Sequence, residues 1–384
     1  MAAWLAIEGR RLTAPKELIE KLAARLDAAG AHIDRIHFST VTLHPQLVAW
    51  GCSWRRGEGA ALFEGQHGAQ NSDAYVGGPL QFVRERHQLF RRRLEALDPE
   101  RDHAFLHEIK AAGMTDYVAL PMEFGTGTVN VFTAATAAAG GFADGDLERI
   151  EALANLLAPL IELIESRRMT LGLLDAFIGP RISERILQGQ VKRGDGDRIE
   201  AAFWYSDLRG FTALSEALPA AQLLQLLNEY FEYCAAAAAA RGGEILQFIG
   251  DAILIVFEIK RPEDEAAVCE GALDAAIDAF ASIAVVNHRR RRAGLPEIEF
   301  GLGLHLGTVT HANVGSPNRL AFNVVGPAVN KTARIQSLTK DAGVPLLLSE
   351  EFAAHIQRPL RSLGRRDLRG VAGAHEVFTP VDGP

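Results

Sequence analysis

The sequence is poor in cysteine and has no excess of positive charge. Its three cysteines, Cys52, Cys234 and Cys269, are odd in number, widely spaced and outside any CxxC or Cys/His pattern. They argue against a disulfide framework and against a zinc site, and they fit a reducing cytoplasm. Acidic residues outnumber basic ones by 48 to 40, which gives a formal net charge of -8. Proteins that bind a phosphate backbone carry the opposite charge, so we expect no nucleic-acid partner.

Long apolar runs are also absent. No segment reaches the about 18 uninterrupted apolar residues that a membrane helix needs, and the first residues lack the flank of a cleaved signal peptide. We therefore expect a cytoplasmic protein that does not enter a membrane. The 384 residues suffice for two or three domains, and their 48% hydrophobic content argues against a disordered chain.

The first part of the chain combines helical and strand patterns. Leu18, Leu22 and Leu26 recur at every fourth residue, which predicts an amphipathic helix. Strands are predicted where β-branched and aromatic residues dominate, at 35–43, at 47–55 and, as a pair, at 116–134. This mixture indicates an α+β domain.

A long helix is predicted after a glycine-rich loop that ends at Asp146, whose charge suits the positive end of the helix dipole. Apolar residues along this helix alternate spacings of three and four: Ile150, Leu153, Leu157, Leu160 and Ile164. The pattern fits either a short parallel coiled coil or a helix buried on its own sheet, and both interpretations stay open.

A second domain is expected after the glycine-rich, charged segment 189–198, which we interpret as a linker. The expected elements are a strand at 200–207, a helix at 217–240, a hairpin at 243–258, a helix at 262–292, strands at 299–310 and 320–325, and a helix at 327–338. The β-α-β-β-α-β order is typical of a ferredoxin-like α+β domain with additions.

Two aspartates of this domain lie at the ends of apolar strands, where burial disfavours a carboxylate. Asp207 ends the strand AAFWYSD, and Asp251 occupies the tight turn of the hairpin. Each alone is explained as an ordinary turn residue. Neighbouring strands of one sheet would, however, bring both carboxylates to the same edge, where they could bind a hard cation such as Mg²⁺.

An anion site is expected beside these carboxylates. Gly210, Phe211 and Thr212 follow Asp207 at the start of a predicted short helix, so their backbone N–H groups can point at phosphate oxygens. A nucleoside triphosphate with its metal is the ligand that fits both the carboxylates and the anion site.

Three segments in this order resemble the motifs of class III nucleotidyl cyclases: FWYSDLRGFTALSE, GGEILQFIGDAILIVF and NVVGPAVNKTARI. The similarity covers roughly residues 200–380. It implies a homodimer whose active sites form between two catalytic domains and convert ATP to 3′,5′-cyclic AMP and pyrophosphate. By this resemblance Asp207, Asp251 and the Leu208 carbonyl hold two divalent metal ions, Mg²⁺ or Mn²⁺, in a two-metal clamp.

The third segment carries two further residues of the resemblance. Asn330 and Arg334 match the family's transition-state pair, and their i, i+4 spacing places them on one helix face. Asn330 would hold the ribose, and Arg334 would balance charge on the α-phosphate. Arg369 matches, more weakly, a basic residue that neutralises the terminal phosphates.

Base selection is where the sequence departs from the family pattern. The position four before Asp251, usually lysine in adenylyl and glutamate in guanylyl members, is Gln247, and its companion is Asn323. Both are amides that offer a donor and an acceptor and can flip. The resemblance favours an adenylate cyclase, with a guanylate or dual-specificity cyclase, or a catalytically silent nucleotide-binding module, as alternatives.

The N-terminal part resembles a GAF-type sensor domain, mainly through TDYVALPMEF and GGFADGDLERIEALANLLAPLIE. The signature of cyclic-nucleotide-binding GAF members is missing, so the signal, a small molecule or a protein, is unknown. We expect a GAF-like sensor or dimerisation domain at 1–166, a helical linker at 167–198 and a class III catalytic domain at 199–384. The sensor would regulate how two catalytic domains meet.

Overall fold

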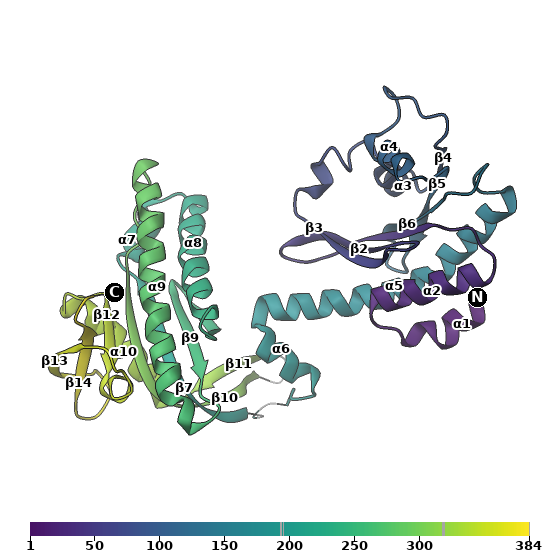
Figure 1. Cartoon of the computed structure of the whole chain (residues 1–384). Helices are drawn as coiled ribbons and strands as arrows, with labels where there is room; N and C mark the ends of the chain where they lie inside the picture. The colour runs from purple at the N-terminus through teal and green to yellow at the C-terminus, as the bar shows by residue number, and fades with distance from the viewer. Residues whose placement is uncertain (193, 195, 317–318, 384) are drawn as a thin grey trace. The chain divides into compact units, whose positions relative to one another are not determined.

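The chain divides into two compact units, Met1–Ser183 and Glu184–Pro384, which are described separately (Figure 1). The structure is a computed structural model. It describes residues 1–383 apart from 193, 195, 317 and 318, and it describes residues 144, 319 and 322 by their backbone alone. No helix within the described residues is long and apolar enough to cross a membrane.

The N-terminal unit is built on an antiparallel sheet with strand order β3-β2-β1-β6-β5-β4. Its strands are β1 (Arg35–Val41), β2 (Leu47–Arg55), β3 (Gly59–Gln66), β4 (Phe90–Arg93), β5 (Asp116–Glu123) and β6 (Val129–Thr136). Its helices are α1 (Ala2–Ile7), α2 (Pro15–Ala28), α3 (Pro79–Arg86), α4 (Ala104–Ala111) and α5 (Asp144–Ile178), with short 3₁₀ turns at Gly9–Arg11 and Ala69–Asn71. The helix predicted from Leu18, Leu22 and Leu26 is confirmed as α2, and the strands predicted at 35–43, 47–55 and 116–134 are confirmed.

Helices cover both faces of this sheet. The apolar faces of α2 and α5 bury one side, in a core that includes Leu22, Trp50 and Leu157. On the other side, α3 and α4 pack Val83 and Leu106 on the sheet. Figure 1 shows the two helical layers on opposite sides of the strands. The α+β prediction for this region is confirmed, whereas its GAF-like identity stays a prediction.

The apolar seam of α5 is used inside its own unit. Ile150, Leu153, Leu157 and Ile164 belong to the buried core, and Leu160 packs against that core half-buried. These side chains therefore support the second of the two interpretations, a helix buried on its own sheet, because the same atoms cannot also form a coiled-coil seam.

The C-terminal unit contains one larger sheet with strand order β13-β14-β12-β10-β7-β9-β8, and β11 also pairs with β10. Its strands are β7 (Gly196–Leu208), β8 (Glu244–Ile249), β9 (Ala252–Glu258), β10 (Phe300–Ser316), β11 (Arg319–Val325), β12 (Leu346–Ser349), β13 (Leu360–Asp367) and β14 (Ala374–Pro380). Its helices are α6 (Pro180–Leu187, which spans the unit boundary), α7 (Phe211–Ala217), α8 (Ala220–Ala239), α9 (Glu265–Arg292), α10 (Pro327–Asp341) and α11 (Glu350–Ala353), with a 3₁₀ turn at Pro262–Asp264.

The predicted β-α-β-β-α-β order is confirmed by β7, α8, β8, β9, α9 and β10. One detail of the expected linker is corrected: β7 begins at Gly196, so 196–198 are strand rather than linker. These residues pair with 310–312 of the long strand β10, and that pairing extends β7 backward into the glycine-rich segment.

Strand β7 divides its side chains between the two faces of the sheet. Ala202 and Trp204 enter the core beneath α8 and α9, whereas Ala201 and Phe203 enter a separate cluster with Ala328 of α10. The period of two therefore places the next odd residues, Tyr205 and Asp207, on the face that α10 partly covers.

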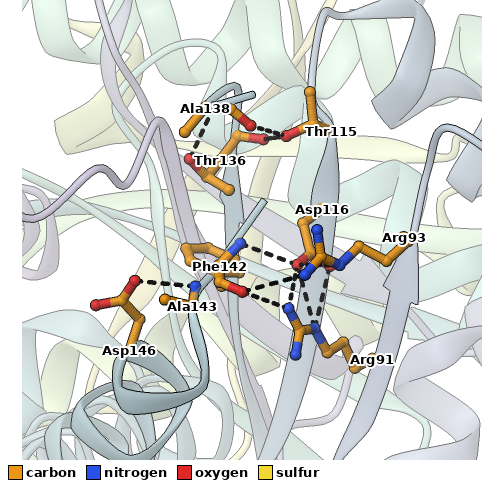
Figure 2. Close-up of polar contacts among 9 residues, drawn as sticks. All are labelled: Arg91, Arg93, Thr115, Asp116, Thr136, Ala138, Phe142, Ala143 and Asp146. Carbon is orange, nitrogen blue, oxygen red and sulfur yellow. Dashed lines mark hydrogen bonds and ion pairs between the residues drawn. The ribbon is translucent and has the colours of Figure 1, made fainter. Parts of the chain in front are cut away.

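The N-terminal sheet is tied to the loop before α5 by a buried carboxylate. Asp116 is fully buried and accepts hydrogen bonds from Arg91 Nη2 at 2.7 Å and from the Phe142 backbone N at 3.1 Å. Arg93 forms a longer ion pair with it, at 3.5 Å, and Figure 2 shows all three groups converging on Asp116. Gly141 leaves the space: a Cβ there would lie 2.6 Å from Asp116 Oδ2.

We expect Asp116→Ala to lower the free energy of unfolding of the N-terminal unit by about 3 kcal/mol, because it leaves the partly buried Arg91 guanidinium without its carboxylate and the buried Phe142 N–H without an acceptor. Urea unfolding followed by circular dichroism measures the change. Asp27→Ala is the matched control, since that side chain pairs with Arg56 at 2.7 Å but is 60% exposed. The control should cost less than about 1 kcal/mol, and equal losses in both variants would contradict the assignment.

Candidate active site

The two predicted aspartates lie side by side in the C-terminal unit. In the antiparallel pairing of β7 with β9, Asp207 is opposite Ala252, so Asp251 in the preceding turn falls next to it. Gly250 makes this turn possible because its φ of +65° lies in the left-handed region that favours glycine. The expectation that the ends of neighbouring strands bring both carboxylates together is confirmed.

Asp251 and burial together destabilise the charged form of Asp207. The pKa of Asp207 is raised from 3.8 to about 7, first by burial and then by the hydrogen bond and the negative charge of Asp251. The Leu208 backbone N–H opposes this shift only partly. A proton or a cation held between the carboxylate oxygens of Asp207 and Asp251 relieves this unfavourable charge.

The donor set fits a hard divalent cation. Within the described residues, no group of three or more His, Cys, Asp or Glu side chains could hold a metal ion. Mg²⁺ commonly binds through one or two carboxylates and takes its remaining oxygen ligands from substrate phosphates and water. Asp207, Asp251 and the Leu208 carbonyl at the end of β7 match that description.

The strand end that carries Asp207 is held from the opposite face. Ser206 is fully buried, and its hydroxyl accepts hydrogen bonds from Trp204 Nε1 at 2.8 Å and from the Tyr230 hydroxyl at 2.7 Å. The bond from Tyr230 ties β7 to α8 directly beside Asp207, and the bond from Trp204 lies within β7.

The expected phosphate-binding turn follows directly. Gly210 has φ +70° and begins α7, whose first residues are Phe211 and Thr212. A Cβ on Gly210 would meet no atom within 4 Å, so glycine is needed for the backbone conformation alone. The predicted start of a short helix is confirmed, and its role toward phosphate stays a prediction.

Asn330 and Arg334 share the exposed face of α10. Their neighbours Lys331, Thr332 and Ile335 are buried against the sheet, which leaves the two predicted residues in solvent. Among the described residues, no hydrogen bond or ion pair joins either of them to Asp207 or Asp251. One chain therefore presents the two halves of the expected site without closing them on each other.

Sequence reasoning missed Tyr205. This half-buried residue lies on the same face of β7 as Asp207, and its pKa is raised first by burial and then by the charges of Asp207 and Asp251. Arg334 opposes that shift, so Tyr205 lies within electrostatic range of both halves of the site. The strand alternation of 203, 205 and 207 is the signal that could have found it.

The expected base-recognition residues lie on different strands. Gln247 is exposed on β8, beside a register shift in the pairing with β9. Asn323 lies on β11, opposite Ala312, and its Oδ1 accepts a hydrogen bond from the Val324 backbone N at 2.8 Å. Arg369 is exposed in the turn between β13 and β14, at the sheet edge opposite β8. Their roles stay predictions.

Comparison with known proteins agrees with this arrangement. Residues 197–379 match the family model described as the adenylate and guanylate cyclase catalytic domain. The similarity to this catalytic domain therefore covers most of the C-terminal unit.

Two curated relatives of the cyclase domain are adenylate cyclase 1 of Rhizobium meliloti and the adenylate cyclase of Anabaena cylindrica. The first is 29% identical over 190 residues, which cover 48% of this chain and 28% of the relative. The second is 35% identical over 159 residues, which cover 40% and 30%. This chain thus spans less than a third of the length of either relative.

A solved structure of a bacterial light-regulated adenylyl cyclase has a similar fold. It is 19% identical to this chain, with a TM-score of 0.51, and the match covers 69% of this chain and 84% of that one. At this identity the likeness concerns the fold alone.

We expect the stability of the metal-free protein to fall as the pH rises from about 4 to about 7. Over that window the folded state holds a proton on Asp207 that the unfolded state has released, because the folded pKa is about 7 and the ordinary value is 3.8. Urea midpoints measured with chelator across this range should decline more steeply for the wild type than for Asp207→Asn. The exposed variant Asp367→Asn should follow the wild type, and parallel profiles for Asp207→Asn and the wild type would contradict the assignment.

Proposed function

We propose that this protein is an adenylate cyclase that converts ATP to 3′,5′-cyclic AMP and pyrophosphate at sites shared by two copies of the chain. The observation that carries the proposal is the interacting carboxylate pair Asp207 and Asp251, at the edge of a sheet within a cyclase-type domain. The names of the two curated relatives, both adenylate cyclases, support ATP as the substrate.

The chain's own groups have distinct roles in this reaction. Asp207, Asp251 and the Leu208 carbonyl supply oxygen ligands for two divalent cations, Mg²⁺ or Mn²⁺. When bound, these ions lower the cost of negative charge on the ribose 3′ oxygen and on the triphosphate. The backbone N–H groups from Gly210 to Thr212 hold phosphate oxygens at the start of α7.

A second copy would complete the site. Asn330 and Arg334 are exposed on α10 and do not contact the carboxylates of their own chain. From the partner copy, Asn330 would orient the ribose for attack of its 3′ oxygen on the α-phosphorus. Arg334 would balance the charge that develops on the α-phosphate, and Arg369 would contact the terminal phosphates.

A shared site also offers a physical route for regulation by the N-terminal unit. A displacement of about 1 Å between catalytic groups can reduce a rate about a hundredfold. A signal that changes how two copies meet would therefore control turnover without altering any residue of the site.

We expect the purified protein to form 3′,5′-cyclic AMP from ATP with Mn²⁺ or Mg²⁺, as identified by chromatography. Asp207→Ala and Arg334→Ala should each lower the rate by at least about 10² to 10³, because each removes a charge that acts on the transition state. An equal mixture of the two variants should recover about one quarter of the wild-type rate, since half of the dimers then hold one intact site.

A mixture of Asp207→Ala with Asp251→Ala is the matched control. It should stay inactive, because both changes damage the same half of the site. Recovery in this control, or none in the first mixture despite demonstrated subunit exchange, would contradict a site shared between copies. A wild type that binds ATP without turnover would instead support a catalytically silent module.

A guanylate or dual-specificity cyclase is the alternative that Gln247 and Asn323 favour. Either amide can rotate to exchange donor for acceptor, so the wrong base leaves fewer polar groups unpaired than it would against a fixed charge. Two amides therefore discriminate weakly between adenine and guanine.

We expect kcat/KM for ATP to exceed that for GTP by roughly tenfold to a hundredfold, not by many thousandfold. Gln247→Lys should increase this ratio, because a lysine offers a fixed donor to adenine N1. Gln222→Lys, on the exposed surface of α8, is the control and should leave the ratio unchanged. A strong preference for GTP, or an unchanged ratio in Gln247→Lys, would remove Gln247 from the base pocket.

A further inference from the structure

A group of basic side chains lies between the N-terminal sheet and helices α3 and α4. Arg35 and His37 project from the same face of β1, as does Ser39 two residues further. Arg84 reaches over from α3, and its Nη2 donates a hydrogen bond to Ser39 Oγ at 2.8 Å. We call Arg35, His37 and Arg84 the basic cluster.

Several polar atoms at the basic cluster are buried without a partner. Within the described residues, Nε of Arg35 and Nε of Arg84 are inaccessible to solvent and form no hydrogen bond. The same holds for the hydroxyl of Tyr117, which lies near Thr133 but lacks hydrogen-bonding geometry and whose side chain is fully buried. Buried donors in native proteins are nearly always paired, so three orphaned groups in one place require an explanation.

The charge of the basic cluster is also uncompensated. Among the described residues, no ion pair involves Arg35 or Arg84, and the carboxylates of Glu58 and Glu108 act on Arg35 only at longer range. Burial lowers the pKa of Arg35, and burial together with both arginines lowers the pKa of His37 to about 3. The imidazole is therefore neutral, and its Nδ1 lies 2.7 Å from Ser53 Oγ.

Aromatic rings surround these cations. The Arg35 guanidinium lies 5.6 Å from the ring centre of Phe105, which in turn lies 5.6 Å from Tyr117. Arg84 lies 5.6 Å from the ring centre of Tyr75, and Phe63 stacks on His37 at 5.0 Å. The rings offer apolar contact on several sides, while the half-buried arginines keep part of their surface within reach of a ligand.

We propose that the basic cluster binds a small aromatic anion, with a carboxylate or phosphate head between Arg35 and Arg84 and a ring against the surrounding aromatic side chains. The anion supplies the missing counter-charge, and the two arginine side chains turn on binding so that their buried N–H groups donate to its oxygens. Carboxylate and phosphate share this chemistry, because both accept several guanidinium donors at once. The site lies within the N-terminal unit and is independent of catalysis by the cyclase domain.

The binding test uses benzoate and phenyl phosphate as probes, with benzyl alcohol as the neutral probe. In the full chain, the Nε–Hε resonances of Arg35 and Arg84 should shift on titration, with a dissociation constant of about 1 mM for fragments of this size. Arg35→Met and Arg84→Met should each weaken binding at least about tenfold. Arg86→Met, an exposed arginine on the same helix as Arg84, should bind as the wild type does.

Each outcome of the titration decides the question. A response to benzoate alone identifies a carboxylate site, a response to phenyl phosphate alone identifies a phosphate-ester site, and a response to both supports a general anion site. No response to either anion, or an equal response to benzyl alcohol, overturns the proposal. Neither readout requires turnover, so failure here is separable from failure of the proposed adenylate cyclase activity.

A stability measurement tests whether Arg35 has only a structural role. Without ligand, Arg35→Met should raise the urea midpoint of the N-terminal unit, because it removes a half-buried charge that has no ion-pair partner. Arg86→Met should leave the midpoint unchanged. A lower midpoint in Arg35→Met would show that the arginine supports the fold, and it would overturn the assignment as an anion site.

Discussion

The candidate site of the C-terminal unit depends on two carboxylates that the fold holds together although their negative charges repel each other. Asp207 and Asp251 are brought into contact by the pairing of β7 with β9, and burial makes ionisation of Asp207 unfavourable. The packing of β7 must therefore hold a locally unfavourable arrangement in place. The proposed cation binding follows from this arrangement, since a divalent ion would relieve both the desolvation and the repulsion.

The alternation of side chains along β7 places the residues that anchor the strand on one face of the sheet and the residues of the candidate site on the other. Trp204 and Ser206 face α8 and α9, where the bonds to Ser206 hold the strand. Tyr205 and Asp207 face the opposite side, toward α10 and solvent. A slip of one residue in the register would exchange these two sets, so the buried face determines where the acidic groups appear.

The N-terminal unit contains one buried charge that is fully paired and two half-buried charges that are not. Asp116 is fully buried and satisfied by Arg91, Arg93 and a backbone N–H, so it connects strand and loop. Arg35 projects from β1 and Arg84 from α3, and each has an Nε donor that nothing in the described chain satisfies. A satisfied buried charge stabilises the fold, whereas an unsatisfied one costs stability and marks a place where a ligand gains binding energy.

Local patterns were enough to predict β7, the hairpin that carries Asp251, and α10, because their apolar periods are strong and their turns contain glycine. The meeting of the two aspartates could also be predicted, since adjacent strands must end at one edge. The sequence of residues 56–115 predicts no helix or strand, because the charged strand β4 and the short helices α3 and α4 lack a clear period. The seam of α5 was ambiguous for a different reason: a helical stripe shows that a surface is buried, but only the tertiary structure shows what covers it. The basic cluster was invisible for the same reason, because its members come from distant segments and the absence of a partner is a property of the packed chain.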